Sequence, residues 1–76
     1  MDLDILKESI IEYCENIFAL GIGYIRKNAD KEVNRLLKKI ELLEDEIRYC
    51  DNIESLNSLK KIIENIGNEL EAKFNE

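Results

Sequence analysis

The side chains that most often perform catalysis at neutral pH are scarce in this sequence. Its 76 residues include no histidine, which is the usual general base and a common metal ligand near pH 7. No base is spaced to activate the three serines, Ser9, Ser55 and Ser58. The glutamate pairs at positions 12 and 15 and at positions 41 and 44 lack the histidine that a di-iron helical site needs. We therefore expect a protein that is not an enzyme and that holds neither a metal nor a cofactor.

One cluster of side chains is suited to binding an anion, and it is a basic segment in the middle of the chain. Residues 26–39 carry a net charge of +4. On a helix part of this set would share one face, because residues three and four apart are neighbours. The pattern suits a site for nucleic acid or another anionic surface. It equally suits a solvated helix face, since no aromatic residue interleaves to stack on bases. The basic residues are Arg26, Lys27, Lys31, Arg35, Lys38 and Lys39.

The two ends of the chain are acidic. With 17 acidic and 11 basic residues the net charge is −6, and residues 1–25 and 51–76 carry −4 and −3 on either side of a central segment at +1. This balance disfavours a general nucleic-acid binder, whose affinity comes mainly from lysine and arginine contacts to phosphates. It is typical of ordinary solubility, or of a protein whose acidic surface imitates a nucleic-acid backbone and docks onto a basic partner.

The two cysteines, Cys14 and Cys50, are predicted to be buried thiols and not a disulfide. They lie 36 residues apart, without a CxxC motif. If the chain turns near residue 29, Cys14 faces about position 44 and Cys50 faces about position 8. That offset is roughly 9 Å at about 1.5 Å per residue, which is beyond disulfide reach. Because the first residues are acidic and do not resemble a secretory signal, we expect a reduced, cytoplasmic protein.

Composition and spacing together predict an all-α fold. The sequence has no proline, no threonine and a single valine, whereas the helix-favouring leucine, glutamate and lysine are abundant. Apolar residues recur at alternating steps of three and four, the heptad spacing of coiled coils. They do so in three segments, at about residues 2–27, 30–50 and 52–74. We expect one domain folded as a three-helix bundle. The alternative is a long helical hairpin in which the second and third segments fuse through a phase slip.

Capping residues set the expected helix boundaries. Asn28 or Asp30 is expected to begin the second helix by accepting hydrogen bonds from its free backbone N–H groups. Asp51 followed by Glu54 has the spacing of a capping box and is expected to begin the third helix. Gly67 and the polar end of the chain, Asn75 and Glu76, predict fraying near the C-terminus.

The first segment is predicted to supply an interface. A second apolar row runs beside its heptad seam, so the stripe is wider than one neighbouring helix covers. Gly21 and Gly23 lie in the same stretch, although each glycine costs roughly 1 kcal/mol relative to alanine in a helix interior. The glycines favour a notch for close packing, with a turn as the first alternative and membrane contact as the second. The predicted oligomer or partner interface comprises Leu6, Ile10, Tyr13, Ile17, Leu20, Gly21 and Tyr24.

The small size of the chain favours association with other proteins. So short a chain buries little core to offset the entropy of ordering it, so a homodimer or higher homo-oligomer is expected. The longest uncharged run, residues 16–25, is shorter than the about twenty residues of a membrane-spanning helix. The predicted function is that of a small acidic regulator or inhibitor, of the kind encoded by mobile elements or accessory operons. It would bind a partner protein through its apolar first helix or its acidic surface. The alternative is a nucleic-acid- or anionic-surface-associated protein that uses the segment from Arg26 to Lys39.

Overall fold

Each of the three apolar segments forms one helix. In the computed structural model, which describes residues 2–75, α1 spans Leu3–Lys27, α2 spans Lys31–Tyr49 and α3 spans Ile53–Phe74. Every bound coincides with the expected one or lies next to it, and no strand occurs within residues 2–75. The all-α, three-helix prediction is confirmed. The helical hairpin is wrong, because Cys50 and Asn52 have extended backbone conformations that interrupt the helix.

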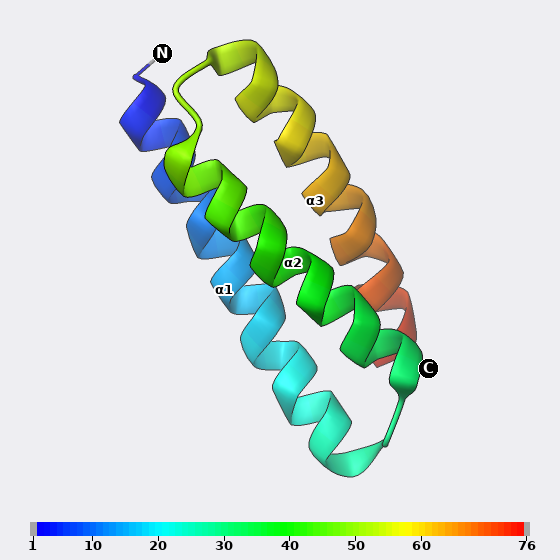
Figure 1. The fold of residues 1–76 in the computed structure, drawn as a ribbon. Coiled ribbons are helices and arrows are strands. Elements are labelled where there is room, and N and C mark those ends of the chain that lie inside the picture. Colours follow the sequence, from blue (N-terminus) through cyan, green and yellow to red (C-terminus); the bar gives the residue numbers. More distant parts are fainter. Residues whose placement is uncertain (1, 76) are drawn as a thin grey trace.

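The three helices lie along one long axis and alternate in direction (Figure 1). The connections, residues 28–30 and 50–52, are so short that consecutive helices lie antiparallel. α3 returns beside both other helices, and each helix contacts the other two. The resulting bundle measures 39 × 16 × 16 Å. The N-terminus and the α2–α3 connection lie at one end, and the C-terminus and the α1–α2 connection lie at the other (Figure 1).

Side-chain caps explain where α2 and α3 begin. The carboxylate of Asp30 accepts hydrogen bonds from two free backbone N–H groups of α2, at 2.9 and 3.2 Å. At α3 the cap is Asn52, whose Oδ1 accepts from the backbone N–H groups of Glu54 at 2.8 Å and Ser55 at 3.1 Å. The prediction that Asp51 caps α3 is therefore wrong by one residue. The helix starts directly after Asn52, so the Asn52 side chain is the one beside the free N–H groups.

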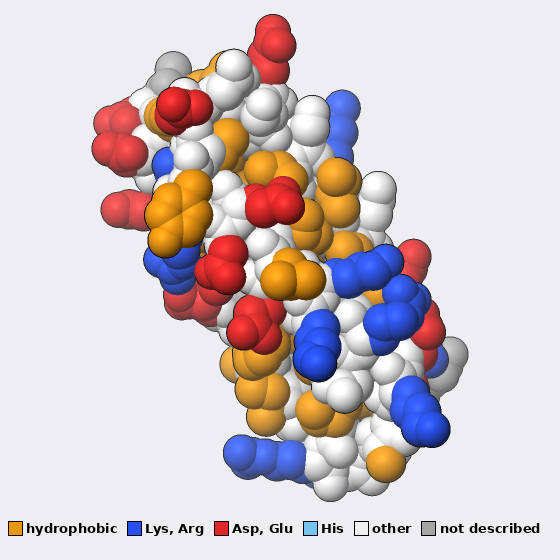
Figure 2. Space-filling view, viewed as in Figure 1, with side chains coloured by type: hydrophobic (Ala, Val, Ile, Leu, Met, Phe, Trp, Pro, Cys, Tyr) orange, Lys and Arg blue, Asp and Glu red, His pale blue; other side chains and the backbone are white. Residues whose placement is uncertain are grey.

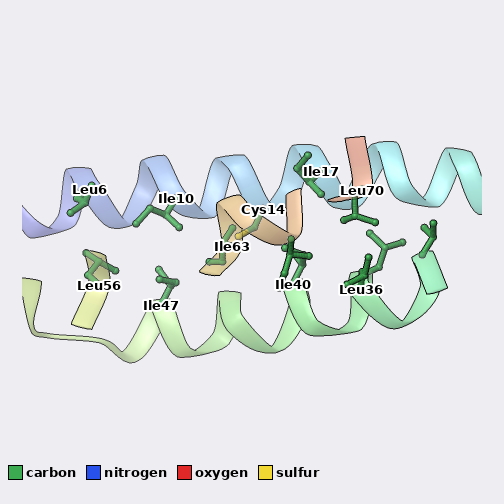
Figure 3. Packing of buried hydrophobic residues seen from close by; sticks show 13 residues of the cluster. Leu6, Ile10, Cys14, Ile17, Leu36, Ile40, Ile47, Leu56, Ile63 and Leu70 are labelled. Carbon is green, nitrogen blue, oxygen red and sulfur yellow. The ribbon is translucent and has the colours of Figure 1, made fainter. Parts of the chain in front are cut away.

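The core is one apolar cluster enclosed by all three helices. Figure 3 shows its side chains pointing inward from α1, α2 and α3. Among residues 2–75 no polar or charged residue is buried. Steps of three and four keep these side chains on one face of each helix, so they can be buried together. The cluster comprises Leu6, Ile10, Cys14, Ile17, Val33, Leu36, Leu37, Ile40, Ile47, Leu56, Ile63, Ile66 and Leu70.

The C-terminal end of α3 is held against the rest of the bundle as far as Phe74, where the helix ends. Of the residues predicted to fray, Glu76 lies outside the described residues. The Lys73 Nζ atom lies 3.3 Å from Oδ2 of Asp30 in the α1–α2 connection. The rings of Tyr24 and Phe74 pack with centroids 5.2 Å apart. Gly67 does not end the helix. It is buried in α3, and a Cβ there would lie 3.2 Å from Cε1 of Tyr13 and still closer to its hydroxyl. Glycine at this position makes room for the tyrosine side chain of α1.

Candidate interaction surfaces

The residues predicted to form an interface on α1 pack mainly inside the bundle. Leu6, Ile10, Ile17 and Gly21 are buried, and Tyr13 and Tyr24 are partly buried against the core. Leu20, at 59% exposure, is the one member of the set that is mostly exposed. The wide apolar stripe needs two neighbours, and α2 and α3 of the same chain supply both. A surface for a partner must therefore be sought elsewhere in the intact bundle.

The two glycines of α1 have different surroundings. The helix continues through both, and no residue within 2–75 has a positive φ, so the turn alternative is wrong. Gly21 is buried, and a Cβ there would lie 3.0 Å from Cγ of Leu37 and closer still to its methyl groups. It is the expected packing notch, but the notch receives a side chain of α2. Gly23 is exposed, with nothing within 4 Å of the position of a Cβ.

The six basic residues predicted to bind an anion are all exposed and are divided between two helices. Arg26 and Lys27 end α1, whereas the other four lie in the first half of α2. Arg35 is already paired with Glu32, with 2.6 Å between Nη2 and Oε1. The hydrogen bond from Arg35 lowers the pKa of the Glu32 carboxyl. Because this arginine is partly neutralised within its own helix, the basic patch is weaker than its sequence suggests.

An outward ridge runs along the whole of α2. Its members recur at alternating steps of four and three and are all exposed, on the side of the helix opposite to the buried row. The first three are basic, the fourth is apolar, the fifth is acidic and the last is aromatic. Figure 2 shows the same order across this face, with most acidic side chains over the upper half and most basic ones over the lower half. The outward ridge comprises Lys31, Arg35, Lys38, Leu42, Asp45 and Tyr49.

The apolar members of the ridge are unusually exposed, and one of them, Leu42, lines a groove. Leu42 is 66% exposed and Tyr49 is 87% exposed. A groove of about 470 Å³ between α2 and α3 starts at Leu42 and is lined across from it by Ile62, which is 47% exposed, and Ile66. Exposed apolar groups that lie together are typical of interaction surfaces. The periodic pattern of α2 does not by itself distinguish this surface, although Leu42 and Tyr49 stand in the charged row of the helix.

A second groove, the acidic groove, lies between α1 and α3 and has a volume of about 450 Å³. Burial raises the pKa of the Tyr13 hydroxyl, and the negative charges of Glu71 and then Glu64 raise it further. An anionic environment thus surrounds an aromatic side chain that is partly accessible. The polar side chains that line the acidic groove are Ser9, Tyr13, Lys60, Glu64, Asn68 and Glu71.

The cysteines are free thiols in different environments. Cys14 is buried, and burial raises its pKa to about 11, with further contributions from Glu44 and Glu15. The proximity of Cys14 to Glu44 agrees with the hairpin geometry expected from the sequence. Cys50 is half-buried, and its Sγ donates to the Asn52 carbonyl at 3.3 Å. Since the thiolate is the reactive form, Cys14 is the less reactive of the two.

Glu44 is the carboxylate that the fold accommodates least well. Its side chain is 19% exposed, and its Oε1 is buried without a hydrogen-bond partner among the described residues. Burial raises the pKa of this carboxyl, while Arg48, whose Nη2 lies 3.8 Å from Oε2, lowers it. The net direction is upward because a 3.8 Å contact with a half-exposed guanidinium does not replace the lost hydration.

Comparisons with protein-family models, with curated proteins and with solved structures give no match. Within residues 2–75, no group of three or more cysteine, aspartate and glutamate side chains is arranged to hold a metal ion. None of the helices in this part of the chain is both long enough and apolar enough to cross a membrane. We infer function from the acidic groove and from the outward ridge of α2.

Proposed function

We propose that this protein is a non-catalytic, cytoplasmic factor that regulates or inhibits a partner protein by binding to it. The contact would be made through the acidic groove between α1 and α3, and the partner would present lysine or arginine side chains. The observation that carries the proposal is that Tyr13 lines the same groove as Glu64 and Glu71. Burial raises the pKa of its hydroxyl, and the charges of Glu71 and then Glu64 raise it further. The apolar face of α1, the other route considered from the sequence, is occupied by the core.

The chemistry of the acidic groove suits a cationic side chain from a protein. A lysine or arginine entering it would find two carboxylates, Glu64 and Glu71, and the ring of Tyr13, which attracts a cation through its face. Lys60 is the single basic residue on the lining. Tyrosine is also a frequent anchor of protein interfaces, because its ring is apolar and its hydroxyl is a hydrogen-bonding group. The remaining exposed acids of α1 would extend the negative field beyond the groove.

The experiment compares two variants of equal charge. Glu64→Gln with Glu71→Gln removes the carboxylates of the groove, whereas Glu41→Gln with Asp51→Asn removes two exposed carboxylates elsewhere. Binding to a fluorescent lysine-rich peptide is measured by anisotropy at low and at moderate salt. We expect the groove variant to bind at least tenfold more weakly, the control variant to bind like the wild-type protein, and salt to weaken both. Equal loss in both variants would reject the groove as the site.

The alternative function uses the basic segment from Arg26 to Lys39 to bind a nucleic acid or another anionic surface. The exposure of all six basic side chains favours it. The four acidic residues that follow on α2, and the pairing of Arg35 with Glu32, oppose it. A mobility-shift assay at low and moderate salt tests it, with Lys31→Glu, Arg35→Glu and Lys38→Glu combined in one variant. A shift of the wild-type protein that this variant loses would favour the alternative.

Self-association is part of the same proposal. The short chain and the exposed apolar groups of α2 and α3 support a homo-oligomer. The steps of three and four along the seams of α1 and α2 support coiled-coil-like packing between these two helices. Sedimentation velocity over a range of protein concentrations tests self-association directly.

A further inference from the structure

We propose that the outward ridge of α2 is a self-recognition surface, on which a second copy of this chain docks antiparallel about a two-fold axis. The inference rests on the self-association proposed above and identifies its surface. It does not depend on the acidic groove, which lies between the other two helices.

The order of side chains along the ridge is self-complementary. In the dimer two copies of α2 run antiparallel, and the two-fold axis lies at the level of residue 40 along the helix. A residue a given number of positions before residue 40 then faces the residue the same number of positions after it in the second copy. Arg35 then faces Asp45 of the second copy, twice in one dimer. Lys38 faces Leu42, on which its aliphatic stem can lie. An isologous interface requires such a match, because one patch meets itself.

The ends of the ridge match in the same register. Lys31 faces Tyr49, whose ring is 87% exposed and attracts a cation through its face. A parallel pair would instead place Arg35 beside Arg35 and Asp45 beside Asp45. The charges therefore select the antiparallel arrangement over the parallel one.

The two halves of the outward ridge differ in charge. Lys31, Arg35 and Lys38 lie in its first half and Asp45 lies in its second half. In an antiparallel pair each basic half lies against an acidic half. The ends of α2 themselves suit the helix dipole, with Glu32 in the first turn and Arg48 in the last.

The available area fits a weak, reversible dimer. The face of the bundle that carries α2 measures at most 39 by 16 Å, so a pair would cover no more than about 600 Å² per copy, at the lower limit of about 1,200 Å² in total for stable interfaces. Leu42, which is 66% exposed, lies near the centre of the ridge, where a hot spot is expected, and Ile62 of α3 lies across the adjoining groove. We expect a dissociation constant in the micromolar range that rises with salt.

The test uses two charge-reversal variants. Each variant alone should lose the dimer, and a mixture of the two should form it again. In a dimer of the Arg35→Glu variant, two acidic residues face each other at both contacts between positions 35 and 45. In a dimer of the Asp45→Arg variant, two basic residues face each other at these contacts. Each variant alone should dissociate at least tenfold more readily than the wild-type protein in sedimentation velocity at low salt. An equimolar mixture should recover dimers, because every contact in the mixed pair joins opposite charges. Recovery also excludes misfolding as the cause of the loss.

Two leucine variants test the apolar centre. Leu42→Ser should weaken the dimer, whereas Leu20→Ser, at a comparably exposed position on α1, should leave it unchanged. A wild-type protein that stays monomeric up to about 1 mM, or a mixture that associates no better than the separate variants, would overturn the inference. Binding of the lysine-rich peptide should survive Arg35→Glu, so failure of the ridge and failure of the acidic groove are distinguished.

Discussion

Replacing Gly21 and Gly23 separately by alanine should change stability in opposite directions, although the two residues lie two positions apart in one helix. Alanine is favoured over glycine in a helix by about 1 kcal/mol, and both variants gain this term. At Gly23 nothing lies within 4 Å of the new Cβ. We therefore expect Gly23→Ala to stabilise the protein by about 1 kcal/mol, which raises the melting temperature of a domain of this size by about 4–8 °C.

At Gly21 a second term opposes the gain. The new Cβ would lie 3.0 Å from Cγ of Leu37 and would overlap the methyl groups of that side chain, which is only 3% exposed. Leu37 can move only by displacing other core side chains, and overpacking of this kind costs about 1–3 kcal/mol. The net effect of Gly21→Ala is then between zero and about 2 kcal/mol of destabilisation. The two variants should differ by about 1–3 kcal/mol.

Urea unfolding followed by circular dichroism measures both variants, with Leu37→Ala in each background as a control. Because Leu37→Ala removes the overlapping methyl groups, it should cost less in the Gly21→Ala background than in the wild-type protein. In the Gly23→Ala background it should cost the same as in the wild-type protein. Equal stabilisation by both alanines, or additivity of Gly21→Ala with Leu37→Ala, would refute the notch.

Three other predictions concern the two cysteine thiols, the cap of α3 and the carboxyl of Glu44. Cys50 should react with a thiol reagent at pH 8 in the native state, whereas Cys14, with its pKa raised to about 11, should react mainly after unfolding. Asn52→Ala should destabilise the protein by about 1 kcal/mol through loss of the α3 cap, and Asp51→Ala should change the urea midpoint little. Glu44→Gln should stabilise the protein at pH 7 and lose that advantage at about pH 3, since a carboxyl whose pKa is raised by folding favours the folded state when protonated. A Glu44→Gln midpoint that lies below that of the wild-type protein at pH 7 would contradict this assignment.

The sequence by itself determined the three apolar segments and most of the helix bounds. Only the structure decided that the second and third segments are separate helices, because the backbone is extended at Cys50 and Asn52. Steps of three and four place Leu6, Ile10 and Ile17 on one face whatever the rest of the chain does, because that periodicity belongs to the helix itself. Capping rules narrowed the start of α2 to Asn28 or Asp30, and the cost of glycine in a helix pointed to a notch at Gly21 and Gly23. The structure selects Asp30 and Gly21. The capping rules missed the exact cap of α3, because Asp51 and Asn52 are both good capping residues and only the first helical residue decides between them.

The tertiary structure alone decided what each face contacts. The wide stripe of α1 has the same pattern whether α2 and α3 or a second chain covers it, and packing within the bundle assigned it to the core. With that stripe buried, the acidic groove and the outward ridge of α2 remain accessible. Tyr13 meets Glu64 and Glu71 only because α1 and α3 are neighbours in space, and such contacts across about fifty residues of chain have no periodic signal. Periodicity records which residues share a face, whereas the partner of that face depends on how the helices pack.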